Sequence, residues 1–187
     1  MRFKFKQGDE LSSEARAVAH DICSGSRGEV PAPLRAWLVN PNFASMSQQL
    51  GDYLRFNSSL PKKLSELSIL CVAHHWGSPF EWEVHKVEAL KVGLEEHIIV
   101  SIHEGGCPLF ESKTESLVFS FCSNALNKKA IDSNLFEQLR ESIGEKGVMD
   151  LIGIMGYYTL ISLTLNTLEI DADSPSLHRE HIDLSTS

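Results

Sequence analysis

The chain has 187 residues, of which 42% are hydrophobic, and a formal net charge of -8 with a pI of about 5.5. This length and apolar content suffice for one ordinary domain with a sizeable core. The acidic balance and the scattered basic residues argue against nucleic acid or an anionic membrane as partners, because phosphate binding needs clustered Lys and Arg. The pairs Lys62-Lys63 and Lys128-Lys129 are too short to form such a cluster.

The first six residues contain no apolar core of the length that a signal peptide needs. We therefore expect a cytoplasmic protein in a reducing compartment. The four cysteines are Cys23, Cys71, Cys107 and Cys122, and no two form a C-x-x-C pair. Neither a redox motif nor a zinc knuckle is expected.

Helical periodicity dominates in chain order, and strand alternation is scarce. The pattern predicts helices over residues 9–23, 35–39, 41–57, 61–76, 79–92, 95–103, 114–129, 133–143 and 146–170. Short loops between helices indicate an all-α bundle, which we place in one domain over residues 1–170. The polar residues 171–187 are expected to form a flexible tail.

Three of these helices carry an apolar stripe that predicts their buried face. The stripes are Phe43, Met46, Leu50, Tyr53 and Leu54; Leu64, Leu67, Leu70 and Cys71; and Phe80, Val84, Val87 and Leu90. Residues 151–168 are uncharged and near the lower length limit of a membrane span. Polar and small residues dilute this segment, so we expect a buried core or interface helix and no membrane partner.

The strongest chemical signal is an acid and an imidazole on one helix. Glu81 and His85 are four residues apart and therefore share a face. A carboxylate beside an imidazole can move a proton near neutral pH. Glu66, on the preceding helix, could direct a second carboxylate to the same place when the chain folds back. These three residues are the candidate catalytic groups.

Each of these residues also has a purely structural interpretation. Residues 78–81 read Ser-Pro-Phe-Glu, a capping box in which Glu81 would bond the backbone N–H of Ser78. His85 could be a hydrogen-bonded histidine at the edge of the core. Glu66 could be a solvated acid near a helix start. The capping role and a chemical role of Glu81 do not exclude each other.

No metal or cofactor is expected. His74 and His75 point to different faces of their helix, and their spacing from the acid–imidazole pair matches no known ligand motif. The chain has no Gly-rich phosphate loop, nucleophile elbow or zinc-protease motif. Trp82 adjoins the candidate site, and Trp82 and Ser78 are weaker candidates for substrate binding.

Three segments of the sequence resemble the carboxymuconolactone decarboxylase-like family, which includes the alkylhydroperoxidase D proteins. They read LPKKLSELSIL at residues 60–70, GSPFEWEVH at 77–85 and ALKVGL at 89–94, and VMDLIGIMGYY at 148–158 looks like the family's last long helix. The resemblance implies an all-helical, alkylhydroperoxidase D-like bundle that assembles as a dimer, trimer or hexamer.

The resemblance also implies which chemistry to expect. The alkylhydroperoxidase branch has Glu, Cys, Cys and His where this chain has Glu66, Ser78, Glu81 and His85. A thiol peroxidase needs both thiols, so the resemblance does not carry peroxidase activity to this chain. The decarboxylase branch has Glu and His at the positions of Glu81 and His85 and uses no metal or organic cofactor.

Three hypotheses follow. The first is a cofactor-free lyase or isomerase that uses Glu81, His85 and Glu66 for proton transfer on a small carboxylated or lactone substrate. The second is an alkylhydroperoxidase-type antioxidant with peroxiredoxin activity, working through a displaced cysteine, Cys71 or Cys107. The third is a non-catalytic oligomeric binding protein that keeps the family fold.

Overall fold

The computed structural model describes residues 2–127 and 130–182. The described residues form helices and one isolated β-bridge, without a strand, so the prediction of an all-α fold is confirmed. The chain divides into two compact units, one of Met1–Asn57 with Thr164–Ser187 and one of Ser58–Leu163.

The first unit is built from short helices. They are η1 (Gly8–Glu10), α1 (Ser13–Ser24), α2 (Ala32–Trp37), α3 (Pro41–Asp52), the π-helical turn η2 (Tyr53–Asn57) and η3 (Arg179–His181). Of these, α1 and α3 have side-chain caps. The hydroxyl of Ser12 accepts a bond from the N–H of Ala15 at 3.2 Å and caps α1. A side-chain cap of this kind satisfies an N–H group that the first helical turn leaves without a partner.

The predicted flexible tail is packed as far as residue 182. Val30 and Leu177 exchange two backbone hydrogen bonds of 2.9 and 2.8 Å, and the side chains of Leu177 and Ile182 are buried. Two apolar residues in a polar segment thus attach it to the first unit. The rest of the predicted tail, residues 183–187, lies outside the described residues.

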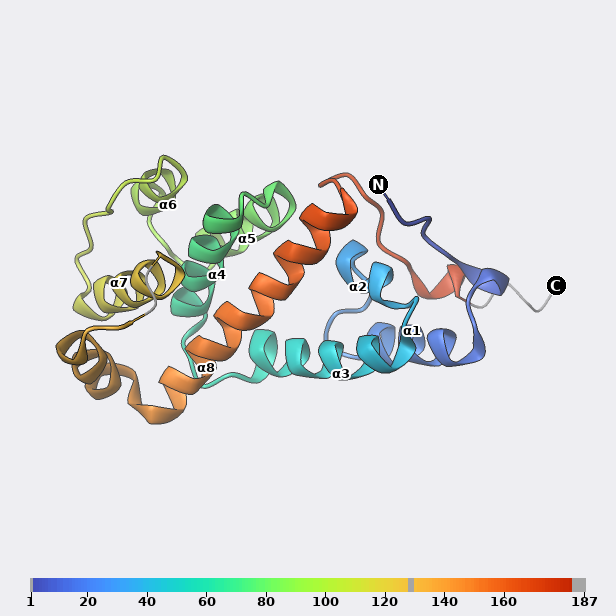
Figure 1. Cartoon of the computed structure of the whole chain (residues 1–187), viewed down its shortest axis with the longest axis horizontal. Coiled ribbons are helices and arrows are strands. Elements are labelled where there is room, and N and C mark those ends of the chain that lie inside the picture. Colours follow the sequence, from blue (N-terminus) through green and yellow to red (C-terminus); the bar gives the residue numbers. More distant parts are fainter. Residues whose placement is uncertain (1, 128–129, 183–187) are drawn as a thin grey trace. The chain divides into compact units, whose positions relative to one another are not determined.

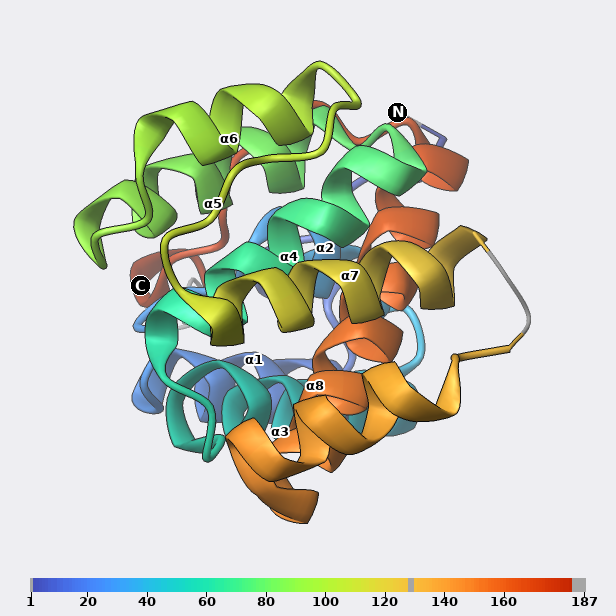
Figure 2. The ribbon, with the colours of Figure 1, turned by 90° about the vertical axis from the view of Figure 1, so that its left-hand side faces the viewer.

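The second unit is a helical bundle around α4 (Lys62–Trp76). Its other helices are α5 (Pro79–Lys91), α6 (Glu96–His103), α7 (Lys113–Asn127) and the greater part of α8 (Ser133–Leu168). α4 packs against α5, α6 and α7 (Figures 1 and 2), and every residue from 64 to 73 is buried. The predicted inward face of α4 is therefore confirmed. The end of the predicted helix 114–129 includes Lys128 and Lys129, which lie outside the described residues.

α8 is one element with a break. Gly144 has φ 72° and ψ 167°, a conformation outside the helical region that suits glycine, so the element divides near the boundary predicted from the sequence. Its apolar part has the length and composition of a membrane span, but 56% of that window is buried inside the protein. This burial is typical of a core helix.

Two predicted apolar faces are largely wrong. Of the stripe predicted for α3 and η2, Leu54 is buried and Phe43 is half-buried, but Met46, Leu50 and Tyr53 are exposed. α3 buries Ala44, Ser47 and Gly51 instead. On α5, Val84, Val87 and Leu90 are exposed, whereas Glu81, Trp82, His85 and Ala89 are buried. Apolar periodicity could not locate the buried face of α5, because its polar residues find their partners in the interior.

Candidate active site

The candidate site depends on the turn between α4 and α5. Gly77 ends α4 in the left-handed conformation, with φ 55° and ψ 48°, where a side chain would be strained. The N–H of Gly77 donates to the carbonyl of His74 at 3.1 Å, and the N–H of Ser78 donates to the carbonyl of Ala73 at 2.9 Å. This is a Schellman-type helix end, and it turns the chain so that α5 packs against α4.

Two side-chain contacts with α8 hold the ends of α4 in place. Before its first turn, a carboxylate oxygen of Asp150 accepts bonds from the backbone N–H and the hydroxyl of Ser59, at 2.7 and 2.6 Å. Near its last turn, the indole N–H of Trp76 donates to the hydroxyl of Thr159 at 3.1 Å. The helix that carries Glu66 is therefore fixed at both ends.

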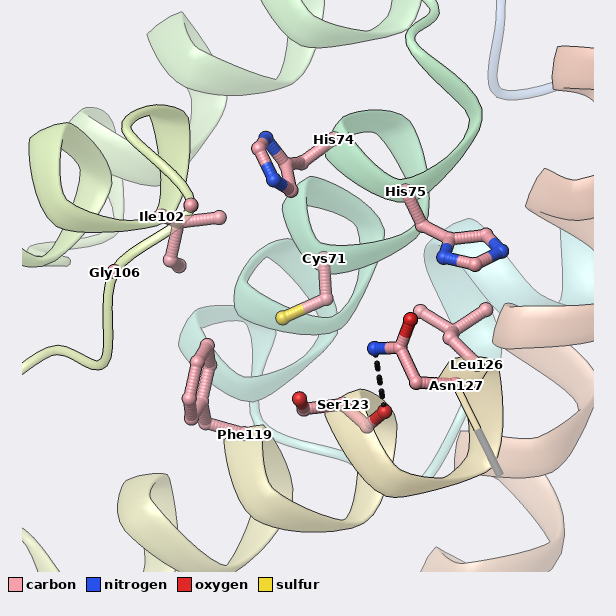
Figure 3. A pocket seen from close by; sticks show the side chains of 10 residues that line it. Cys71, His74, His75, Ile102, Gly106, Phe119, Ser123, Leu126 and Asn127 are labelled. Carbon is pink, nitrogen blue, oxygen red and sulfur yellow. Dashed lines mark hydrogen bonds between the residues drawn. The ribbon is translucent and has the colours of Figure 1, made fainter. Parts of the chain in front are cut away.

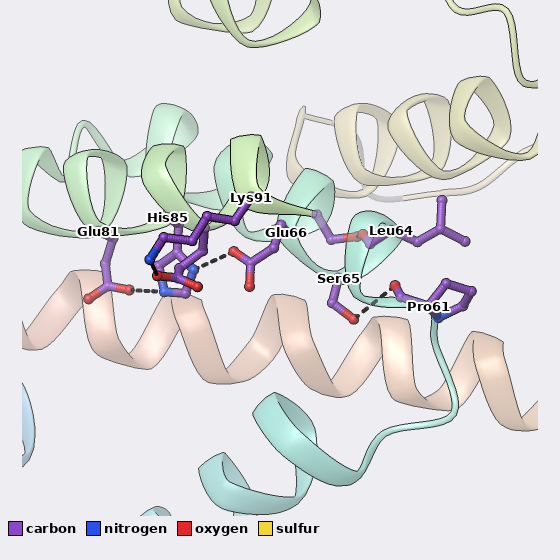
Figure 4. Close-up of polar contacts among 9 residues, drawn as sticks. Pro61, Leu64, Ser65, Glu66, Glu81, His85 and Lys91 are labelled. Carbon is purple, nitrogen blue, oxygen red and sulfur yellow. Dashed lines mark hydrogen bonds and ion pairs between the residues drawn. The ribbon is translucent and has the colours of Figure 1, made fainter. Parts of the chain in front are cut away.

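The structure brings the three predicted catalytic residues together. Nδ1 of His85 lies 2.6 Å from Oε2 of Glu66, and Nε2 lies 3.3 Å from Oε2 of Glu81. Figure 4 shows the imidazole ring between the two carboxylates. His85 is 1% exposed, Glu66 6% and Glu81 4%, so the whole cluster is shielded from solvent. We call it the Glu–His–Glu cluster.

This environment raises the pKa of His85 to about 8. Burial alone would lower the pKa, because it disfavours the charged imidazolium. The hydrogen bonds to Glu66 and Glu81, and the negative charges of both carboxylates, outweigh that effect. At neutral pH the ring is therefore mostly protonated, with Nδ1 hydrogen-bonded to Glu66 and Nε2 in an ion pair with Glu81.

The capping-box interpretation of Glu81 is wrong. The N–H of Ser78, which Glu81 would have to accept, already donates to Ala73 at the helix end. The side chain of Ser78 makes no capping bond to α5, and the carboxylate of Glu81 faces His85 instead. The Schellman turn and the capping box would use the same N–H group of Ser78, and in this structure it bonds within the turn.

Sequence reasoning did not assign Tyr158, which contacts the cluster. Its ring meets the ring of His85 edge to face, with the centroids 4.9 Å apart and the planes at 88°. Tyr158 lies in the apolar part of α8 and is 4% exposed. The paired tyrosines in the resemblance segment 148–158 were the available signal, but periodicity alone cannot identify which ring packs on the histidine.

A cavity of about 230 Å³ opens beside the first turn of α5. Ser78 and Trp82, the two weaker candidates for substrate binding, both line it, together with His74 and His103. The ring of Trp82 lies against the imidazole of His103, with centroids 4.8 Å apart. The hydroxyl of Ser78 is buried and has no hydrogen-bond partner among the described residues. Glu81 lies between Ser78 and Trp82 in sequence, but the lining of this cavity includes neither Glu81 nor His85.

The structure places Cys71 beside a different cavity, of about 350 Å³, between α4 and α7. Figure 3 shows its sulfur directed toward Phe119 and Ser123. A hydrogen bond with the Cys122 thiol, together with burial, raises the pKa of Cys71 well above its ordinary value. Peroxide attack requires a thiolate, so this environment does not favour a peroxidase that works through Cys71. Cys107 is exposed.

Within residues 2–127 and 130–182, no three His, Cys, Asp or Glu side chains are grouped as ligands for a metal ion. In the Glu–His–Glu cluster, each ring nitrogen of His85 already faces a carboxylate. An imidazole must offer a free lone pair to bind a metal, and the raised pKa of His85 works against this.

Comparison with known proteins gives evidence at the level of the fold. No family model matches the chain, and no curated protein matches its sequence. Among solved structures, it is similar to an uncharacterized peroxidase-related protein from Silicibacter sp. TM1040, with a TM-score of 0.73 at 15% identity. The match covers 97% of this chain and 93% of that chain. This likeness shows that the chain shares the fold of that protein.

Proposed function

We propose that this protein is a cofactor-free lyase or isomerase that transfers protons on a small carboxylated or lactone substrate. The observation that carries the proposal is the buried imidazole of His85, held between the carboxylates of Glu66 and Glu81 at 2.6 and 3.3 Å. A general acid works best when its pKa lies near the working pH, and the pKa of His85 is about 8.

In the proposed reaction, the C–C bond to a carboxylate breaks, carbon dioxide leaves and the bonding electrons remain on the substrate as an enolate. The proton that neutralises the enolate carbon comes from the cluster. The proton starts on the His85 imidazolium and passes from Nε2 to Glu81, which hands it to the enolate carbon. We assign this last step to Glu81 because it lies on the first turn of α5, beside the cavity; Glu81 is 4% exposed, so its carboxylate must turn toward the substrate. Glu66 holds the other ring nitrogen, and water restores the proton. An isomerase would use the same groups to remove a proton and return it at another carbon.

The cavity lined by Ser78 and Trp82 is the proposed substrate site. It supplies an indole face for an unsaturated or ring-shaped body and a buried hydroxyl that still needs a partner. It also adjoins the start of α5, where the helix dipole favours negative charge. Each of these features suits a small acid or lactone.

Deuterium incorporation tests this proposal across a panel of candidate substrates. Small unsaturated acids and carboxylated lactones are incubated with the protein in D2O. Proton NMR follows the shift of the neighbouring C–H signals when the carboxylate is lost, and the C–H signals that disappear where deuterium enters. Glu81→Gln and His85→Asn should abolish the exchange, whereas Glu88→Gln, which removes a half-buried carboxylate of the same helix that pairs with Lys91, should not. Full exchange in both cluster variants contradicts the mechanism.

A non-catalytic role is the second candidate, and the burial of all three cluster residues favours it. In that role the Glu–His–Glu cluster joins α4 to α5 and fixes the fold of a binding protein. The cluster variants would then lose stability, while no substrate in the panel would exchange with either the wild-type protein or the variants.

We also propose that the protein self-associates through α5. Val84, Val87 and Leu90 are spaced three residues apart on one exposed face of that helix, an apolar stripe of the kind that marks an interface. Light scattering after size-exclusion chromatography should show a dimer, trimer or hexamer that Val87→Lys dissociates. A monomeric wild-type protein would contradict this assignment.

A further inference from the structure

A second group of charged residues lies in the first unit, around a cavity of about 260 Å³. The last turns of α1 and α3 and the loop that follows α1 line it, and it is open to solvent. Its lining carries one guanidinium, from Arg27, and two carboxylates, from Asp21 and Asp52. The side-chain amides of Gln48 and Gln49 add further hydrogen-bonding groups.

The guanidinium of Arg27 is incompletely bonded. Its Nε and Nη2 atoms are buried, and neither has a hydrogen-bond partner among the described residues. The ring of Phe56 lies beneath it, with the guanidinium carbon 5.8 Å from the ring centroid. A cation–π contact of this kind orients the group but does not satisfy its N–H donors. Buried donors without an acceptor are costly, so this site lacks an acceptor.

The two carboxylates do not supply that acceptor. Within the described part of the chain, neither Asp21 nor Asp52 forms an ion pair with Arg27, although all three line the same cavity. Both acids also lie at C-terminal helix ends, where the helix dipole adds negative potential. The cavity therefore has a cationic donor and an anionic region that are separated from each other.

We propose that this cavity binds a free α-amino acid, whose carboxylate pairs with Arg27 and whose ammonium group lies toward Asp21 and Asp52. A zwitterion presents an acceptor and a cation at once and so matches both charges of the cavity. A planar guanidinium suits a carboxylate, since it can donate two parallel hydrogen bonds. The cavity is smaller than the ~300–1,000 Å³ typical of sites for drug-sized ligands, which fits a ligand of a few heavy atoms.

Calorimetric titration of the full chain with each of the twenty L-amino acids tests the proposal. At least one should bind, and its methyl ester and its N-acetyl derivative should each bind at least about tenfold more weakly, because each lacks one of the two charges. Arg27→Gln and Asp52→Asn should weaken binding by a similar factor. Arg16→Gln is the matched control, since Arg16 belongs to the same unit but does not line the cavity.

Three results would overturn the proposal. The first is that no amino acid binds at ~10 mM. The second is that the methyl ester or the N-acetyl derivative binds as tightly as the amino acid itself. The third is that both cavity variants, shown by circular dichroism to be folded, keep the wild-type affinity. In the first case, water alone would satisfy Arg27. Because the ligand panel and the variants differ from those of the proton-transfer test, either proposal can fail without the other.

Discussion

Two groups of charged residues, the buried Glu–His–Glu cluster in one unit and the partly exposed group around Arg27 in the other, satisfy their charges in opposite ways. In the Glu–His–Glu cluster, the charged groups touch one another, and every ring nitrogen of His85 has a partner. Around Arg27, the opposite charges line a cavity without meeting, and two guanidinium nitrogens stay unbonded among the described residues. Satisfied charges contribute to the fold, whereas unsatisfied charges are available to a ligand. The difference predicts that stability depends on the first group and binding on the second.

The largest expected effect is on the stability of the second unit. His85→Ala removes the cation of the cluster and leaves the carboxylates of Glu66 and Glu81 buried without it. Loss of one partner from a buried ion pair costs about 3–5 kcal/mol. Arg27→Gln breaks no ion pair within the described part of the chain and should cost less than about 1 kcal/mol. Urea denaturation measures both, and equal losses would remove the distinction between the two groups.

The pH dependence of stability follows from the pKa of His85, which is about 8 in the folded protein and 6.5 without these contacts. Because the folded pKa is the higher one, the stabilisation is fully present below pH 6.5 and is lost as the pH rises through 8. Linkage gives a loss of about 2 kcal/mol between pH 6 and pH 9. Urea midpoints across this range should show the decline in the wild-type protein and a flatter profile in His85→Asn.

The two carboxylates should contribute unequally. The contact of His85 with Glu66 is 2.6 Å long and that with Glu81 is 3.3 Å, so the first is the stronger hydrogen bond. Glu66→Gln should therefore lower the pKa of His85 more than Glu81→Gln does. NMR titration of the imidazole resonances measures both shifts. The opposite order would show that Glu81 stabilises the imidazolium of His85 more strongly than Glu66 does.

The sequence predicted the members of the cluster better than it predicted their surroundings. Glu81 and His85 were identifiable from their four-residue spacing on one helix. Glu66 was identifiable because the break at Gly77 lets the preceding helix fold back toward them. The buried face of α5 was not, since its valines and Leu90 carry the apolar pattern yet point outward. Burial of a polar residue depends on partners from another helix, and local periodicity contains no information about them.

Arg27 illustrates the same limit in a different way. It follows Ser24-Gly25-Ser26 in a segment whose sequence predicts only a helix break. Its place in a candidate site becomes visible only in the fold, where Asp52 of another helix lines the same cavity. Contacts between residues distant in sequence decide whether a loop arginine is solvated or enclosed. Residues 171–182 show this too, because Leu177 is held by Val30.

The smallest expected effect concerns Ser78, whose hydroxyl is unbonded among the described residues, like the guanidinium nitrogens of Arg27. Ser78→Ala removes a buried hydroxyl that has no partner there, so stability should be unchanged or should rise by up to about 1 kcal/mol. Ser12→Ala is the matched control, because Ser12 does cap its helix, accepting the N–H of Ala15 at 3.2 Å, and it should lose about 1 kcal/mol. Thermal and urea denaturation compare the two variants.

A loss in Ser78→Ala as large as that in Ser12→Ala would restore the capping role of Ser78. A neutral result would leave the hydroxyl as a group that stability does not require and that a substrate in the Trp82 cavity can use.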